Sequence, residues 1–143
     1  MLQAGRHPAT AELFGAAEEG NLERVQQLIA ANADVNAELR DFNAERTPLL
    51  HAVGHGHEAI VRLLLDHGAA VNQSGVHGES ITPLHKVAFE GHDRIAQLLL
   101  DKGANKDAKD DKGKTPATLA REAQAYFPGY PGHDAVIALL TPP

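Results

Sequence analysis

The sequence has no cysteine, no tryptophan and a single methionine among its 143 residues. Without cysteine the chain can form no disulfide, no thiol nucleophile and no thiolate metal site. No apolar run approaches the ~18 residues that a membrane-spanning helix requires, and the first residues lack the apolar core of a secretory signal. We therefore expect a soluble, cytoplasmic protein without membrane insertion.

Positive charge is also scarce. The chain has 13 Lys and Arg against 19 Asp and Glu, which gives a formal net charge of −6. A protein that binds nucleic acid needs a basic surface for the phosphate backbone. We therefore expect no nucleic acid partner.

The familiar catalytic motifs are missing as well. The sequence has no nucleophile elbow, no glycine loop of the phosphate-binding kind and no HExxH motif. Asp110 and Asp111 are adjacent in the chain, so they are not a converging acid and base. We predict that the protein is not an enzyme, has no catalytic residue and uses no cofactor.

What the sequence does contain is an internal repeat. Residues 47–72 align without a gap on residues 82–107, and a weaker copy occupies residues 11–36. A further Thr-Pro pair opens a fourth unit, residues 115–141. Repeats of this length are typical of proteins built from stacked supersecondary units.

The pattern of each unit predicts a pair of helices. A threonine that can cap a helix stands before a proline that suits the first helical position, at Thr47, Thr82 and Thr115. A residue that tolerates the left-handed conformation follows the second apolar run, at Asn32, Gly68 and Gly103. The residues that start and end the helices therefore recur once in each repeat unit.

A helix pair this small cannot bury its apolar face alone, so it must stack on the next copy. The outer copies should then differ from the inner ones. Arg24 and Gln27 in the first copy stand where the second has Ile60 and Leu63, as expected for a face turned to water. At the other end Thr141 replaces a leucine. We expect a complete, monomeric array.

The period, the Thr82-Pro83-Leu84-His85 motif and the GADVN-like ends of the units resemble the ankyrin repeat. The resemblance implies an all-α solenoid of stacked helix-turn-helix pairs joined by β-hairpin-like finger loops. It implies one domain, residues 1–143, in which repeats 11–36 and 115–141 act as caps. The second unit departs from the motif with Thr-Pro-Leu-Leu-His, and the fourth with Thr-Pro-Ala-Thr.

Ankyrin proteins bind other proteins through their fingers and the exposed side of their first helices, which line a concave surface. The resemblance therefore implies a protein-protein interaction module or adaptor, with an inhibitor that occludes an enzyme as an alternative. The partner-binding positions it implies here are Arg40, Phe42, His51, His55, His77, Lys86, Phe89 and Glu90. Phe89 is the strongest candidate hot spot, although it could instead pack on its own finger or on a neighbouring helix.

Nine histidines suggest a rival function, the binding of a metal or small ligand. His51 and His55 would share one face of a helix and His57 follows closely, so their imidazoles could converge on zinc. No acidic residue stands at a spacing that would make it a further zinc ligand. His57 and His92 also occupy the Gly-His position of the ankyrin repeat, where the imidazole makes a local hydrogen bond. We expect no metal site.

The stretch AYFPGYPGHD, residues 125–134, holds three of the six Phe and Tyr residues: Tyr126, Phe127 and Tyr130. Thr115 to Gly132 spans 17 residues where the inner units span 9, so eight residues are inserted, near 124–131. Each Pro-Gly pair suits a type II turn. We expect a stiff loop at the edge opposite the fingers, away from the binding surface, which either caps the last repeat or forms an accessory binding site.

Overall fold

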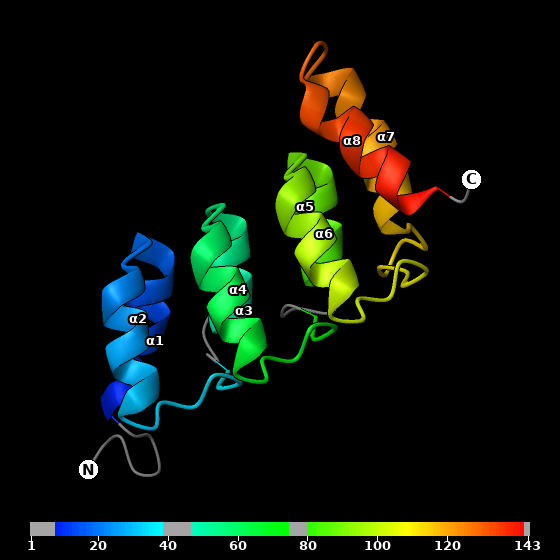
Figure 1. The fold of residues 1–143 in the computed structure, drawn as a ribbon. Helices are drawn as coiled ribbons and strands as arrows, with labels where there is room; N and C mark the ends of the chain where they lie inside the picture. Colours follow the sequence, from blue (N-terminus) through cyan, green and yellow to red (C-terminus); the bar gives the residue numbers. More distant parts are fainter. Residues whose placement is uncertain (1–7, 39–46, 75–79, 142–143) are drawn as a thin grey trace. The chain divides into compact units, whose positions relative to one another are not determined.

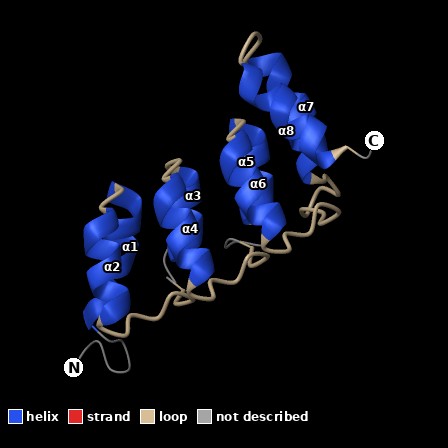
Figure 2. Cartoon of the chain, viewed as in Figure 1, coloured by secondary structure: helices blue, strands red, loops and turns tan. Residues whose placement is uncertain are grey.

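The structure, a computed structural model, describes residues 8–38, 47–74 and 80–141. The chain divides into two compact units, unit 1 (Met1–Ala70) and unit 2 (Val71–Pro143). Figure 1 shows paired helices in each unit. Over the described residues the fold is all-α, with helices joined by turns and no strand (Figure 2). That the two units form one domain of four repeats stays a prediction.

Unit 1 contains the helices of the first two repeats. They are α1 (Pro8–Glu19), α2 (Leu22–Ala30), α3 (Pro48–Gly54) and α4 (Glu58–Asp66). α1 packs on α3, and α2 packs on α4. The core between them is aliphatic and almost fully buried, and includes Leu13, Val25, Leu28, Leu49, Ile60 and Leu64. Each pair thus buries its apolar face on its neighbour, as stacking requires.

Unit 2 contains the helices of the last two repeats. They are α5 (Pro83–Glu90), α6 (Asp93–Asp101), α7 (Pro116–Tyr126) and α8 (Pro131–Leu140). α5 packs on α7, and both α5 and α6 contact α8. The core includes Leu84, Val87, Leu99 and Val136, while α7 contributes the small side chains Ala120 and Ala123.

The predicted helix starts and stops are confirmed. The hydroxyls of Thr47, Thr82 and Thr115 each accept a hydrogen bond from a backbone N–H in the first helical turn, and a proline follows each of them. Asn32, Gly68 and Gly103 all have positive φ, with values of 68°, 91° and 92°. These residues therefore end the second helices as the sequence predicts.

Asparagine side chains join neighbouring repeats within each unit. In unit 1 the Asn36 amide accepts from the N–H of Ala70 at 2.7 Å and donates to the carbonyl of Gly68 at 3.0 Å. In unit 2 Asn72 makes the same pair of bonds, to the N–H of Asn105 and the carbonyl of Gly103. The asparagine that closes one repeat thus makes hydrogen bonds to the backbone N–H and C=O groups of the loop in the next repeat.

The outer face of the first repeat is polar, as its sequence predicts. Gln27 is exposed, and the Arg24 guanidinium pairs with Glu12 at 2.6 Å and donates to Gln27 at 3.1 Å. No large apolar side chain stands on this part of α2, so the face can remain in contact with water.

The inserted stretch differs from the prediction in one of its two turns. Pro128 and Gly129 do form a tight turn, because Gly129 has a φ of 86° and the Tyr130 N–H donates to the Phe127 carbonyl at 3.2 Å. The second Pro-Gly pair does not form a turn. Pro131 takes the first position of α8, so the pair lies inside the helix. The remaining inserted residues lengthen α7 to 11 residues, against 7 in α3 and 8 in α5.

The third finger, which lies in the loop between α6 and α7, is a closed turn over residues 110–114 centred on Asp110. Its carboxylate accepts the N–H groups of Lys112 at 2.9 Å and Lys114 at 2.8 Å. Burial would raise the pKa of Asp110, but these backbone bonds and the neighbouring positive groups lower it below its ordinary value. The hydrogen bond to Glu122 in turn raises the pKa of Lys114.

His85 joins this finger to α5. Its Nε2 donates to the carbonyl of Lys114 at 2.9 Å, and its Nδ1 accepts the N–H of Thr82, which completes a capping box. The imidazole is buried. The histidine of the Thr-Pro-Leu-His motif is therefore a structural bridge between the start of α5 and the loop that precedes α7.

Candidate partner-binding groove

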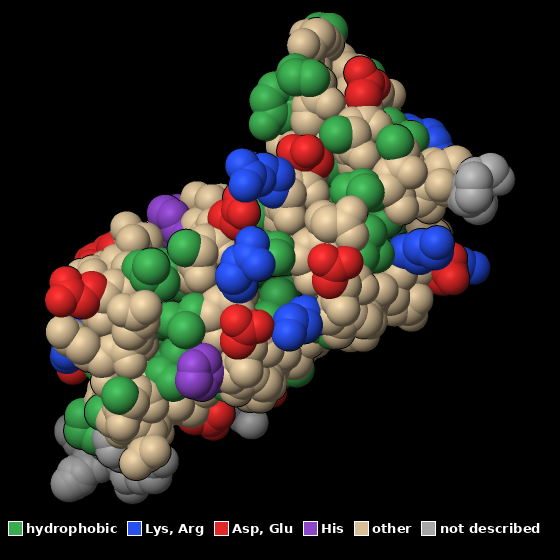
Figure 3. Space-filling view, viewed as in Figure 1, with side chains coloured by type: hydrophobic (Ala, Val, Ile, Leu, Met, Phe, Trp, Pro, Cys, Tyr) green, Lys and Arg blue, Asp and Glu red, His purple; other side chains and the backbone are tan. Residues whose placement is uncertain are grey.

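Large apolar side chains reach the surface of the described residues in one region. Phe89 is 39% exposed, Phe127 48%, Tyr130 46% and Tyr126 72%, and all four belong to unit 2. The space-filling view shows hydrophobic side chains at the surface near the turn between α7 and α8 (Figure 3). Exposed apolar groups gathered in one place often mark an interaction site.

The region is built on a close contact between two backbones. Gly91 ends α5 with a φ of 78°, a left-handed conformation that glycine adopts without strain. A Cβ on Gly91 would lie 2.7 Å from the ring of Tyr130, and a Cβ on Gly132 would lie 2.1 Å from the carbonyl oxygen of Gly91. Only glycine at both positions lets the start of α8 approach the end of α5 this closely.

His133 joins the two helices at this contact. Its ring is 1% exposed, and its Nε2 lies 2.7 Å from the carbonyl oxygen of Phe89. Because a carbonyl oxygen only accepts, Nε2 carries the proton. The second nitrogen, Nδ1, is buried without a hydrogen-bond partner. His133 therefore ties the end of α5 to the first turn of α8.

Aromatic rings from the insertion enclose this histidine. The Phe127 ring stacks on His133 with centroids 5.7 Å apart, and the Tyr130 ring meets it edge to face at 5.3 Å. Phe127 also meets Phe89 edge to face at 6.4 Å. These distances lie within the range of favourable aromatic pairs. The insertion therefore lies beside Phe89, one of the predicted partner-binding residues, whereas the sequence predicts an insertion away from those residues.

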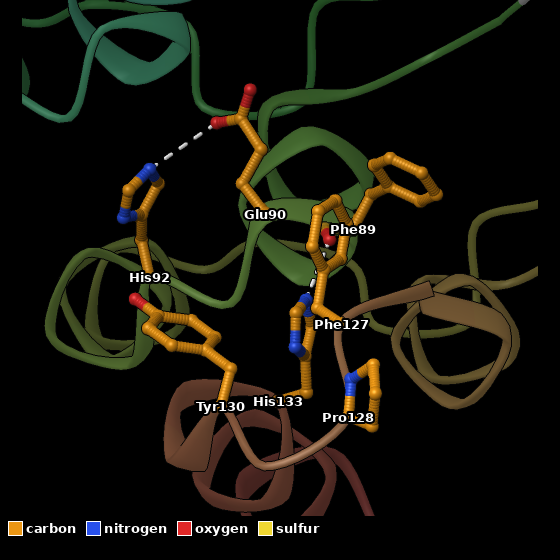
Figure 4. Close-up of a pocket in the computed structure, with 7 residues that line it drawn as sticks. All are labelled: Phe89, Glu90, His92, Phe127, Pro128, Tyr130 and His133. Atoms are coloured by element: carbon orange, nitrogen blue, oxygen red, sulfur yellow. Dashed lines mark hydrogen bonds and ion pairs between the residues drawn. The ribbon is translucent and has the colours of Figure 1, made fainter. Parts of the chain in front are cut away.

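The rings border an open groove of about 660 Å³. Its lining residues are Phe89, Glu90, His92, Phe127, Pro128, Tyr130 and His133. Figure 4 shows Phe89, Phe127 and Pro128 on one side, with Tyr130 and His92 on the other. The volume is in the range of pockets that hold small ligands or anchoring side chains.

Unit 1 has an equivalent joint, in which a histidine of one repeat meets the glycine that ends the first helix of the preceding repeat, with different neighbours around it. Gly20 follows α1 with a φ of 79°, and a Cβ there would lie 2.6 Å from the ring of His57. The Nε2 of His57 donates to the carbonyl of Glu18 at 2.9 Å, as His133 does to Phe89. His57 is only half-buried, and the ring beside it is that of His55, stacked at 6.0 Å.

A family model for ankyrin repeats (3 copies) matches residues 13–110, which is more than half of the chain. The chain belongs to the ankyrin-repeat family. Two relatives, from rat and mouse, are both called Arf-GAP with coiled-coil, ANK repeat and PH domain-containing protein 2. Each is 40% identical over 67 residues, 47% of this chain. The chain spans only 9% of the length of these relatives.

Ankyrin repeats are in general protein-protein interaction modules, and the family is typically non-catalytic. Among the described residues, no helix is both long and apolar enough to cross a membrane.

The structure places the predicted ankyrin contact residues in different environments. Arg40, Phe42 and His77 lie outside the described residues. His51 is 2% exposed and points into the core, where its Nδ1 donates to the Thr47 carbonyl at 2.9 Å, so it offers no surface to a partner. His55 is exposed and Lys86 is half-buried. Only Phe89 and Glu90 reach the groove.

The three histidines of the metal-binding alternative are used by the ankyrin scaffold. His51 and His55 each have Nδ1 on a backbone carbonyl one turn earlier in the chain, and His57 has Nε2 on the carbonyl of Glu18. The bond of His57 spans two repeats, so the expectation of a local bond is wrong. Within the described residues no three His, Asp or Glu side chains are placed to hold a metal.

Sequence reasoning missed His133, His92 and Pro128 as groove residues. A signal for His133 was present, because Gly132-His133 occupies the Gly-His position of the fourth repeat. The inserted residues concealed that equivalence.

Proposed function

We propose that the chain is a non-catalytic protein-protein interaction module, an adaptor that binds a partner protein at the groove of unit 2. One observation carries this proposal: the four exposed large apolar side chains of the described residues all lie in unit 2, and three of them line the groove. The family supports the general role, and the exposed rings of the groove support this location for it.

The groove has the composition of an interface hot spot. Aromatic residues bury large areas at a low cost in side-chain entropy and are enriched at the centre of interfaces. Phe89, Phe127 and Tyr130 are held in place by their contacts with each other and with His133. A partner would therefore meet a preformed surface, which reduces the ordering cost of binding.

Two further parts of the proposal come from the sequence. We expect the fingers to add contacts through Arg40, Phe42 and His77. We also expect a cytoplasmic monomer, and the polar outer face at Arg24 and Gln27 supports a monomer because it offers no apolar surface for a second copy. Light scattering coupled to gel filtration measures the oligomeric state.

The experiment that tests the proposal is capture of partners from a lysate of the encoding organism. The baits are the wild type, a Phe89→Ala/Phe127→Ala variant and a Tyr126→Ala variant. Tyr126 is the matched control, because it is the most exposed of the four side chains but does not line the groove. We expect proteins that the wild type and the Tyr126→Ala variant retain and that the double variant loses.

Thermal melting followed by circular dichroism shows whether each bait is folded. If all three folded baits recover the same proteins, the groove is not the binding surface. A partner identified in this way also distinguishes an adaptor from an inhibitor, because an inhibitor would reduce the activity of its captured enzyme.

A further inference from the structure

We infer that the groove of unit 2 binds an uncharged, proline-rich segment of the partner in the polyproline II conformation. This inference rests on the proposed function and specifies the chemistry of the segment that enters the groove. Three features of the groove support it: its accessible rings, its charge and its scarcity of hydrogen-bonding groups.

The accessible part of the groove is aromatic. The side chains of Phe89, Phe127 and Tyr130 are between 39% and 48% exposed, so a ligand can reach all three rings. Phe127 meets Phe89 edge to face at 6.4 Å and stacks on the buried His133 at 5.7 Å, which holds the rings in place. Grooves lined by aromatic rings are the surfaces that proline-rich segments bind, because a pyrrolidine ring packs flat on an aromatic face.

The charge of the groove favours an uncharged ligand. The lining contains no lysine or arginine that would attract an acidic segment, and the chain has a net charge of −6. Its one carboxylate, that of Glu90, is turned away from the rings of Phe127 and Tyr130 (Figure 4), and the Oε1 atom lies 3.3 Å from His92 and is excluded from water. A basic residue on these rings would therefore meet no counter-charge beside them.

The groove also offers few partners to the backbone of a bound segment. The described residues contain no strand, so an extended segment finds no sheet edge there to pair with. The two buried polar atoms without a partner, Oε1 of Glu90 and Nδ1 of His133, are out of reach of a ligand. An ordinary segment would thus cover the rings with backbone N–H groups that lack an acceptor, which is costly. Proline has no N–H, and the polyproline II backbone needs no hydrogen bond of its own.

The size of the groove favours a run of prolines over a single one. Its volume of about 660 Å³ is larger than one pyrrolidine ring, and Pro128 adds to its apolar wall. Polyproline II rises only about 3.1 Å per residue, so neighbouring prolines present their rings at short, fixed intervals. Because such a segment is already ordered before it binds, as the rings of the groove are, the ordering cost of binding is low.

The test is an NMR titration of the ¹⁵N-labelled chain with two blocked peptides. One is Ac-Ser-Pro-Pro-Ser-Pro-Pro-Ser-NH₂, and the other has valine in place of each proline. Valine keeps the number of side-chain carbons but restores the backbone N–H and the freedom of the backbone. We expect amide shifts confined to residues 89–92 and 127–133, and binding of the proline peptide about tenfold tighter than that of the valine peptide.

Variants show whether the rings are responsible. Phe127→Ala should weaken binding of the proline peptide about fivefold, because it removes one of the ring faces. The matched control is Tyr126→Ala, since Tyr126 is the most exposed of the large apolar side chains but does not line the groove. This control and Glu90→Gln should both bind as the wild type does. The spectra themselves show that each variant is folded.

The peptide protons give a second readout that needs no variant. Ring currents shield protons that lie over an aromatic face, so the side-chain protons of the bound prolines should move upfield in the presence of the wild type. Protons of a peptide that binds elsewhere on the chain would keep their shifts, which would contradict the inference.

Three further results would overturn it: equal binding of the two peptides, equal binding to wild type and the Phe127→Ala variant, or weaker binding to the Glu90→Gln variant. A captured partner that depends on Phe89 and Phe127 but binds through a segment without proline would end the inference and leave the proposed function standing. Recovery of the same proteins by all three folded baits would instead end the proposed function.

Discussion

The contact between consecutive repeats has the same backbone and histidine arrangement in unit 1 and in unit 2, but the side chains around that contact differ. In both, a left-handed glycine ends a first helix, and the histidine of the following repeat donates to a carbonyl near that helix end. In unit 1 the histidine, His57, is half-buried beside His55. In unit 2 it is His133, fully buried under Phe127 and Tyr130.

The difference shows how an insertion can add exposed aromatic side chains without changing the contacts of the repeat. The histidine and glycine of unit 2 keep their structural contacts, and the inserted residues supply rings around them. The extra residues lengthen α7, form one turn and start α8 earlier, so His133 lies within the first turn of α8 while His57 precedes α4.

The largest effect is expected at Gly132. Gly132→Ala would place a Cβ 2.1 Å from the Gly91 carbonyl oxygen, and because that atom belongs to the backbone, the helix ends must separate. We expect the free energy of unfolding to fall by roughly 3 kcal/mol. Gly129→Ala is the control: its φ is 86° but no atom lies within 4 Å of its Cβ, so the loss should be about 1 kcal/mol. Urea unfolding followed by circular dichroism measures both, and equal losses would contradict the close contact.

The histidines of the two joints should differ in importance. His133→Leu removes the donor to the Phe89 carbonyl in a buried site, which should lower the free energy of unfolding by about 2 kcal/mol. His57→Leu removes the equivalent bond to Glu18, where water can replace the donor, so we expect about 0.5 kcal/mol. If His57→Leu is as costly as His133→Leu, the two joints are energetically alike and the comparison fails.

A smaller change in stability tests whether the inserted residues cap the last repeat or bind a partner. Phe127→Ala removes two ring contacts and should lower the free energy of unfolding by about 1 kcal/mol, whereas Tyr126→Ala should change it by less than about 0.5 kcal/mol. A loss well above 2 kcal/mol for Phe127→Ala would favour the capping function that the sequence analysis left open.

The smallest effect concerns the third finger and depends on pH. The folded-state pKa of Asp110 is lowered, so its carboxylate stabilises the fold fully above the ordinary pKa near 4, and this stabilisation is lost as the pH falls through the folded-state value. Asp110→Asn should therefore be less stable than the wild type at pH 7, by about 1 kcal/mol or less. The difference should shrink below about pH 4 in melting curves. A difference that is the same at pH 3 and pH 7 would show that the charge of Asp110 is not responsible.

The repeat frame could be predicted because its signals are local. Thr-Pro pairs, helix-ending glycines and the apolar period each depend on a few adjacent residues, and the structure has helices where they predict them. The groove could not be predicted, because it depends on how an insertion without a repeat partner folds. The second Pro-Gly pair suits either a turn or a helix start. Only the contact of Gly132 with Gly91 decides between them.

Site-specific photo-crosslinking tests the central claim most directly. One protein carries p-benzoylphenylalanine in place of Phe127, in the groove of unit 2, and the other carries it in place of His55, beside the equivalent joint of unit 1. After irradiation in lysate, we expect a specific crosslinked partner from position 127 and none from position 55. A partner crosslinked only from position 55, or from neither position, would contradict it.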